Sequence, residues 1–300
     1  MMVIMTLYAA LDIGSNSVRL LLGEVAGEHV KPRRAELRST RLLAGATGGW
    51  LQEEPVRRTA AAVAELAGLA RGYHPAGMAC IATSAAREAR NPEILTAAVA
   101  TGAGLDVIII DGSVEARLTY RGALAGLTVP VDNPLVIDIG GGSTEFSWRE
   151  GGEVQFTSVR VGAVRVMEES LDREAIRSLL APVLARVRKS RPGFIIGTGG
   201  TITTLAALEL ALPTYRPELV HGLVLPAGRV EDWRRRLAAL PLEARRNLPG
   251  LQPERADIIV AGVTILEIIL AGLGAAGLQV SEADLLWGLL LAMARGERLK

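Results

Sequence analysis

The stretch Asp12-Ile13-Gly14-Ser15-Asn16-Ser17 returns, in altered form, as Asp138-Ile139-Gly140-Gly141-Gly142-Ser143. Each copy follows a short apolar run and precedes a second strand-like run, so each is predicted to be the tight turn of a β-hairpin. Glycine and serine leave the backbone N–H groups of such a turn uncovered, which suits phosphate oxygens. The aspartate that opens each copy adds a carboxylate that a hydrated Mg²⁺ can use. One such turn in each half of the chain predicts a duplicated fold that closes on a phosphate-bearing ligand.

The overall composition is that of an ordered globular protein. The 300 residues are 49% hydrophobic and 22% charged, which is enough for two domains with sizeable cores. The formal net charge is +1, so no global field attracts nucleic acid or a membrane surface, and we expect neither as a partner. The single cysteine, Cys80, lies in a strand-like run and is predicted to be a buried, inert thiol. The first residues lack the basic region of a secretory signal, and together these features predict a cytoplasmic protein.

Hydrophobic periodicity predicts the same order of elements in both halves. In the first half we expect strands near 6–13, 17–25, 35–43, 78–83 and 105–110, and helices over 53–71, after Pro92 and over 113–125. In the second half we expect strands near 134–140, 144–149, 153–161 and 194–196, a hairpin turn at Gly151-Gly152, a helix over 172–189 capped by Asp172, and a mostly helical remainder. This order predicts an α/β fold with a mixed sheet in each lobe.

The polar segment Thr128–Pro134 carries two prolines and no periodicity, so we place the domain junction there. The predicted lobes are therefore 1–128 and 129–300, with the C-terminal helix as a candidate to pack back on the first lobe. The apolar run 258–280 is long enough to span a bilayer. Because Glu267 lies in its middle and four glycines weaken the helix, we predict a buried core helix followed by a turn and a short strand.

Three further segments have the composition of a phosphate site. Gly199 and Gly200 lie between a strand and a helix start, where unpaired N–H groups and a partial positive charge attract anions. Arg87 follows another strand and offers a planar fork for phosphate, the alternative being a solvated helix start. Glu115 lies in the first turn of a predicted helix, where it is either a general base or an acid that stabilises the helix dipole.

These segments resemble the exopolyphosphatase/guanosine pentaphosphate phosphohydrolase (Ppx/GppA phosphatase) family of the actin-like ATPase superfamily. The resemblance is collinear and covers nearly the whole chain. The matching stretches are ALDIGSNSVRL (10–20), ATSAAREARN (82–91), DGSVEARL (111–118), LVIDIGGGSTE (135–145), VGAVR (161–165), GTGGT (197–201), HG (221–222) and PERADIIVAG (253–262). The resemblance implies two actin-like, ribonuclease H-like lobes around a central cleft. It also implies an exophosphatase that removes terminal phosphate from inorganic polyphosphate or from guanosine pentaphosphate, with guanosine tetraphosphate as a related ligand.

The resemblance also implies roles for individual residues. Glu115 matches the family's catalytic glutamate, which positions or deprotonates the attacking water, and Arg87 matches an arginine that lies by the site. Asp138 and Glu145 match the Mg²⁺ site, to which we add Asp12, with Mn²⁺ as the alternative ion. The expected phosphate-binding residues are Gly14, Ser15, Asn16, Ser17, Arg19, Gly140, Gly141, Gly142, Ser143, Thr144, Gly199 and Gly200.

The chain departs from the family pattern in two places. Val114 stands where the family usually has an acid beside the catalytic glutamate, and Leu286-Trp287 replaces an Arg-Glu pair. Two alternatives therefore stay open: a non-catalytic or weakly catalytic sensor of polyphosphate or a guanosine alarmone, and an ATP-dependent small-molecule kinase of the same fold. The apolar C-terminal region further predicts a homodimer.

Overall fold

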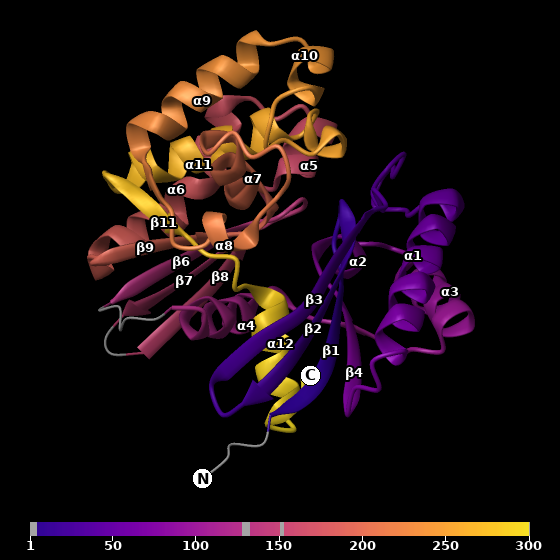
Figure 1. Ribbon diagram of the computed structural model, residues 1–300. Helices are drawn as coiled ribbons and strands as arrows, with labels where there is room; N and C mark the ends of the chain where they lie inside the picture. The colour runs from indigo at the N-terminus through magenta and orange to yellow at the C-terminus, as the bar shows by residue number, and fades with distance from the viewer. Residues whose placement is uncertain (1–4, 128–132, 151–152, 300) are drawn as a thin grey trace. The chain divides into compact units, whose positions relative to one another are not determined.

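The computed structural model describes residues 5–127, 133–150 and 153–299, which form two compact units (Figure 1). The first unit contains the described residues up to Gly126 and again from Leu285 onward. The second unit contains the described residues from Leu127 to Asp284. Each unit is built on a mixed β-sheet flanked by helices, which confirms the predicted fold class. Residues 128–132 of the predicted junction and the predicted turn at 151–152 lie outside the described residues.

The sheet of the first unit has the strand order β3-β2-β1-β4-β5. Its strands are β1 (Thr6–Ile13), β2 (Ser17–Ala26), β3 (His29–Ser39), β4 (Gly77–Ala82) and β5 (Val107–Ile109). Its helices are α1 (Glu53–Arg71), α2 (Ser84–Arg87), α3 (Pro92–Ala103), α4 (Gly112–Ala125) and α12 (Leu285–Ala294). The hairpins β1–β2 and β2–β3 are antiparallel, whereas β1, β4 and β5 run parallel.

Both faces of this sheet are covered by helices. Alternation along β1 sends Leu11 and Ile13 into the core that includes α1 and α3. It sends Ala10 into a second core, which contains residues of α4 and α12. Helices α4 and α12 pack closely, because a Cβ on Gly288 would lie 1.9 Å from the Leu118 carbonyl oxygen. The apolar character of α12 is explained by this burial within the first unit.

Strand β3 begins earlier than predicted. We expected a strand near 35–43, but the strand starts at His29, directly after the two-residue turn that contains Gly27 with φ +58°. Its residues are polar and mostly half-exposed because β3 is an edge strand, so it lacks the apolar alternation that identifies a strand. Pro32 lies at a shift in the β2–β3 register, where an edge strand tolerates a missing N–H group.

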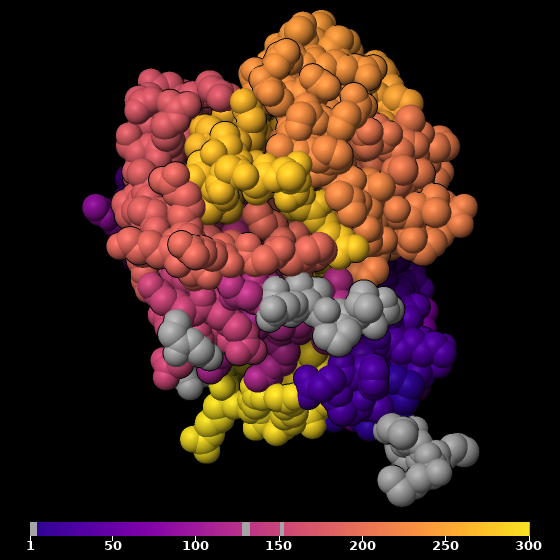
Figure 2. Space-filling view, turned by 90° about the vertical axis from the view of Figure 1, so that its left-hand side faces the viewer, coloured from indigo at the N-terminus to yellow at the C-terminus, as the bar shows by residue number. Residues whose placement is uncertain are grey.

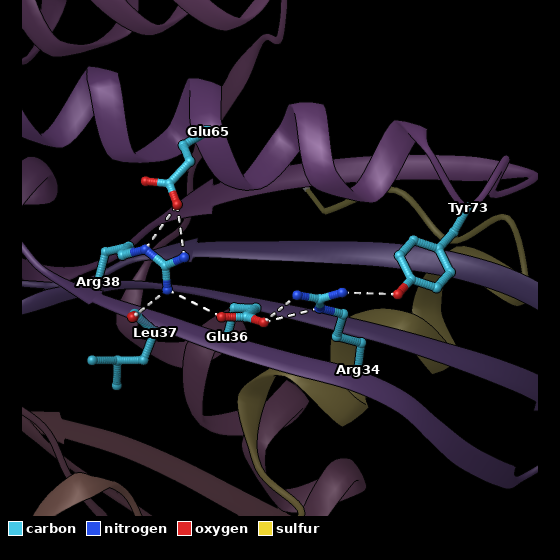
Figure 3. Close-up of polar contacts among 6 residues, drawn as sticks. All are labelled: Arg34, Glu36, Leu37, Arg38, Glu65 and Tyr73. Carbon is cyan, nitrogen blue, oxygen red and sulfur yellow. Dashed lines mark hydrogen bonds and ion pairs between the residues drawn. The ribbon is translucent and has the colours of Figure 1, made fainter.

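A chain of charged side chains covers part of this edge strand (Figure 3). Arg38 donates to Glu65 of α1 at 2.7 Å and to Glu36 at 3.1 Å. Arg34 bonds Glu36 and donates to the Tyr73 hydroxyl at 2.9 Å. The bonds that Glu36 accepts, from Arg38 first and then from Arg34, hold the pKa of its carboxyl below its usual value. Charges along an edge strand discourage pairing with another chain.

The sheet of the second unit has the order β10-β11-β9-β6-β7-β8. Its strands are β6 (Pro134–Ile139), β7 (Thr144–Glu150), β8 (Glu153–Val159), β9 (Phe194–Thr198), β10 (Val224–Pro226) and β11 (Gly277–Val280). Its helices are α5 (Ala163–Glu168), α6 (Arg173–Ser190), α7 (Gly200–Glu209), α8 (Pro217–Val220), α9 (Ala227–Ala239), α10 (Leu242–Arg246) and α11 (Ile259–Leu273), with a 3₁₀ turn at Pro253–Arg255. Figure 2 shows the orange atoms of the α9–α10 region gathered at one end of this unit.

The core of the second unit joins one face of its sheet to these helices. Leu135, Ile137 and Ile139 of β6 enter it together with residues of α6, α7 and α11. Asp172 accepts a hydrogen bond from the Ala175 N–H at 2.8 Å, which confirms the predicted N-cap of α6. The predicted core helix and short strand in 258–280 are α11 and β11. None of the described helices is both long enough and apolar enough to span a membrane.

Candidate active site

Most of the predicted site residues lie at or just after the carboxyl ends of parallel strands in both units. In the first unit these strands are β1, β4 and β5, and in the second they are β6 and β9. Parallel strands end at the same edge of a sheet, and ligands of open α/β sheets bind outside that edge. Each unit therefore places its polar loops where a ligand is expected.

The first turn is the predicted hairpin between β1 and β2. The Gly14 N–H donates to the Ser17 carbonyl at 3.0 Å and closes it. The Asn16 carbonyl accepts hydrogen bonds from the backbone N–H groups of Thr40 and Arg41, each at 2.9 Å. Inside the turn, the buried hydroxyl of Ser15 lies 3.3 Å from that of Ser84, which begins α2. The turn is thus fixed both to the segment after β3 and to the segment after β4.

Asp12 and Arg19 form an ion pair across the same hairpin. They are direct cross-strand partners in the β1–β2 register. Arg19 donates from Nε at 3.1 Å and from Nη2 at 2.9 Å, both to Oδ2 of Asp12. A guanidinium therefore balances the buried Asp12 carboxylate. On the neighbouring strand, burial and the Asp12 charge raise the pKa of Cys80 to about 12, which fits the predicted inert thiol.

Glu115 is held by Arg87. The Arg87 guanidinium donates from Nη1 to Oε2 of Glu115 at 2.8 Å and to the Ile110 carbonyl at 3.1 Å. Glu115 is only 7% exposed although it lies in the first turn of α4. Asp111 caps this helix by accepting from the N–H groups of Val114 and Ser113, and the bond from Val114 is the main reason that the pKa of Asp111 is lowered. Asp111 thus caps the N-terminus of α4, so Glu115 is not needed for that purpose. The buried Glu115 carboxylate is instead held in place by Arg87.

The second turn, between β6 and β7, repeats the first in its closing bond. The Gly140 N–H donates to the Ser143 carbonyl at 3.0 Å. Its carbonyl groups are bonded by the start of α5: Gly140 accepts from the Ala163 N–H at 3.0 Å, and Gly141 accepts from the Val164 N–H at 2.8 Å. Thr144 donates from its hydroxyl to the Val161 carbonyl at 2.6 Å.

Asp138 and Glu145 are direct cross-strand partners in the β6–β7 hairpin. Side chains of such a pair lie on the same face of the sheet with their Cβ atoms roughly 5 Å apart. Both are buried, with Asp138 9% and Glu145 2% exposed, and Ser158 of β8 donates to Oε1 of Glu145 at 2.7 Å. Two buried carboxylates in this position repel one another, and a cation beside them relieves that repulsion.

The third turn joins β9 to α7 and lies against Asp138. Gly199 has φ +87°, and a Cβ at this residue would lie 2.1 Å from Oδ1 of Asp138. Only glycine allows this conformation and this close approach together. At the next position the Arg255 guanidinium lies against the helix start, because a Cβ on Gly200 would lie 1.8 Å from its Nη1. Arg255 thus adds a cation to the N-terminus of α7.

The carboxylate pair fits a hydrated Mg²⁺. Within the described residues of either unit, no three His, Cys, Asp or Glu side chains converge as a metal-binding group. Mg²⁺ does not require such a group, because it keeps several waters and is usually held by one or two carboxylates together with substrate phosphates. Asp138 and Glu145 supply that donor set in the second unit.

Each unit therefore brings its own predicted residues together. The first unit groups Asp12, Gly14, Ser15, Asn16, Ser17, Arg19, Arg87 and Glu115 at one sheet edge. The second unit groups Asp138, Gly140, Gly141, Gly142, Ser143, Thr144, Glu145, Gly199 and Gly200. A single cleft shared by the two groups concerns the arrangement of the units and stays a prediction, as do the roles of the individual residues.

Four polar residues of these sheet edges were not among the predicted site residues. Ser84 and Ser158 contact site residues from neighbouring elements, and Arg165 and Arg255 contact glycine turns. Arg165 and Arg255 lie in VGAVR and PERADIIVAG, two of the stretches that resemble the family. That resemblance is a signal that could have identified them, although no role was predicted for either residue.

Comparison with known proteins shows the family. The Ppx/GppA phosphatase family matches residues 25–297. The chain is 31% identical to Exopolyphosphatase 2 of Mycobacterium tuberculosis, over 97% of this chain and 99% of that protein. The crystal structure of the Aquifex aeolicus member of the Ppx/GppA family is similar, with 31% identity, a TM-score of 0.80 and coverage of 98% of this chain and 99% of that chain. An exopolyphosphatase structure from Cytophaga hutchinsonii has the same fold, with 24% identity, a TM-score of 0.88 and coverage of 98% and 99%.

The family match and the similarity to Exopolyphosphatase 2 both extend over most of the chain. The chain belongs to the Ppx/GppA phosphatase family, and it is a hydrolase.

Proposed function

We propose that this chain is a Mg²⁺-dependent exopolyphosphatase, which hydrolyses the terminal phosphoanhydride bond of inorganic polyphosphate. The observation that carries the proposal is the buried carboxylate pair Asp138–Glu145 beside a turn of three glycines. Such a turn suits phosphate oxygens, and the pair suits the cation that accompanies them. The likeness to Exopolyphosphatase 2 over nearly the full length of both chains supports the same substrate class.

Glu115 is proposed to act on the attacking water. A carboxylate accepts a proton from water only when it is fixed within hydrogen-bond reach of that water. Arg87 holds the Glu115 carboxylate in place through a hydrogen bond of 2.8 Å from its Nη1 to Oε2 of Glu115. The water oxygen bonds to the terminal phosphorus while the bridging P–O bond breaks. The water proton passes to Glu115, and the shortened polyphosphate leaves with the bridging oxygen.

The remaining charge is met by cations and N–H groups. Phosphoryl transfer spreads negative charge over the equatorial oxygens, so catalysis depends on donors that are already in place. Arg19, the turn at 140–143 and the start of α7 with Arg255 are the donors proposed here. When bound, Mg²⁺ would neutralise phosphoryl oxygens next to Asp138 and Glu145, with Mn²⁺ as the alternative ion and Asp12 as a further ligand.

Guanosine pentaphosphate is the second proposed substrate, because its terminal phosphate presents the same anhydride chemistry. A cytoplasmic location and a homodimer are proposed as well. The apolar C-terminal residues that motivated the homodimer are buried inside the two units, so its interface has to lie elsewhere.

Phosphate release from short and long polyphosphate, guanosine pentaphosphate and ATP tests the proposal. Each substrate is assayed with Mg²⁺, with Mn²⁺ and with a chelator. We expect release from polyphosphate that stops on chelation. Tight polyphosphate or alarmone binding without release would overturn the enzyme assignment in favour of the sensor, and phosphorylation of an added small-molecule acceptor by ATP would favour the kinase.

A further inference from the structure

Arg165 contacts the second glycine turn, at 140–143, from the side opposite to the one where we expect the phosphate ligand of that turn. The guanidinium donates from Nε to the Gly142 carbonyl at 2.8 Å, and the residue is 9% exposed. From Nη1 it also donates to Glu169, one helical turn further along, at 2.8 Å. A mostly buried arginine thus bonds the backbone of the turn as well as a residue of its own helix.

The start of α5 bonds every carbonyl group from 140 to 142. Gly140 accepts from Ala163, Gly141 accepts from Val164 and from the Arg165 N–H at 3.0 Å, and Gly142 accepts from the Arg165 side chain. The approach is so close that a Cβ on Gly162 would lie 2.4 Å from the Gly141 carbonyl oxygen. The segment at 162–165 therefore holds the whole back of the turn.

This clamp determines where the N–H groups of the turn point. In a planar trans peptide the C=O of one residue and the N–H of the next point in opposite directions. Because the three carbonyls are directed toward α5, the N–H groups of Gly141, Gly142 and Ser143 are directed away from it. The Gly142 carbonyl shares its peptide plane with the Ser143 N–H, so Arg165 sets the orientation of that N–H group.

We propose that Arg165 is a positioning residue, which aims the N–H groups at 141–143 at a phosphoryl group of the substrate. This inference rests on the proposed function of the same turn. Arg165 does not touch the substrate in this scheme, since its guanidinium lies behind the turn. Glycine has no side chain to fix its own backbone, so a run of three glycines needs an external clamp to keep one orientation.

Replacing Arg165 by Met removes the donor while keeping most of the volume, and Arg165→Lys keeps the charge without the planar fork. We expect both variants to raise the KM for polyphosphate and the inhibition constant for inorganic phosphate, with kcat/KM falling roughly ten- to hundred-fold, as a displaced binding group does. Glu169→Gln removes the outer ion pair but leaves the Nε donor, so it is the matched control and should stay within about twofold of the parent chain.

A merely structural role predicts a different result. Arg165→Met would then lower the melting temperature and the amount of active protein, while KM and phosphate inhibition of the folded fraction stay unchanged, and this outcome overturns the proposal. If Arg165→Met does not fold, Arg165→Lys decides by the same two constants. Failure of the proposed function is a separate result, because the parent chain would then release no phosphate from polyphosphate.

Discussion

The two hairpin turns share one backbone design but differ in charge. Both are closed by the same N–H to carbonyl bond at 3.0 Å, and both follow a strand that ends in an aspartate and an isoleucine. Across the hairpin, however, Asp12 faces Arg19, whereas Asp138 faces Glu145. The first unit thus places an arginine opposite its aspartate, whereas the second unit places another carboxylate there. The same turn geometry therefore carries two different cross-strand pairs, an ion pair in the first unit and a carboxylate pair in the second.

The two turns also differ in what holds their third carbonyl. In the first turn, the backbone N–H groups of Thr40 and Arg41 bond the Asn16 carbonyl. In the second turn, the Arg165 side chain bonds the equivalent carbonyl of Gly142. A side-chain clamp can be removed by a single substitution, whereas a backbone clamp cannot, so the second turn is the more sensitive to mutation.

The largest expected effect on activity concerns Glu115, the proposed proton acceptor, which lies in the first unit. Glu115→Gln keeps the size of the side chain but removes its proton acceptor, so kcat for phosphate release should fall about 10³-fold. The melting temperature should change little. The exposed Glu93→Gln in the same unit is the control and should retain full turnover. Turnover by Glu115→Gln close to that of the parent chain would remove Glu115 from the mechanism.

The metal dependence of paired variants tests the difference between the two aspartates. Asp138→Asn should raise the Mg²⁺ concentration for half-maximal activity by roughly 100-fold, since it removes one of two carboxylates. Asp12→Asn should raise the Mg²⁺ requirement less, since Asp12 is only a further ligand, and should also raise KM, because Arg19 loses the partner that holds it. Metal titrations of both variants measure this. Equal shifts in Mg²⁺ requirement would show that the two aspartates contribute equally to holding the ion and would break the comparison.

A glycine pair of the second unit tests how tightly its site is built. Gly199→Ala forces a Cβ against the Asp138 carboxylate at positive φ and should cost about 3 kcal/mol in the free energy of unfolding. Gly274 also has positive φ but has no atom within 4 Å of its added Cβ, so Gly274→Ala should cost only about 1 kcal/mol. Urea denaturation compares them. Equal losses would mean that the turn shifts freely away from Asp138.

The smallest effect concerns the cap that begins the helix of Glu115. Hydrogen bonds from Val114 and Ser113 lower the pKa of Asp111, so its stabilising contribution is present above the unfolded-state pKa of about 4 and is lost as the pH falls through the lower folded value. Asn also caps helices but does not titrate in this range. The stability advantage of the parent chain over Asp111→Asn, measured by denaturation at pH 7 and below pH 4, should therefore shrink in acid. An advantage independent of pH would contradict this.

The local sequence pattern was sufficient to predict the two β-hairpins and their cross-strand pairs, because the turn of a hairpin determines which residues of its two strands face each other. Once Gly14–Ser17 is a turn, Asp12 must lie opposite Arg19. The beginning of β3 was not predictable in this way, since an exposed edge strand has no apolar face. The role of Arg165 was also hidden, because its partner is a carbonyl 23 residues away in the chain and a backbone atom carries no sequence signature.

The first unit is assembled from both ends of the chain, because α12 covers the sheet face that also packs against α4. During synthesis the ribosome delivers the β1 and β2 face long before Leu285–Ala294 emerges. The second unit, which is continuous in sequence, can complete its core earlier. Until α12 has emerged, the sheet face that carries Ala10 and Leu21 therefore lacks one of the two helices that cover it.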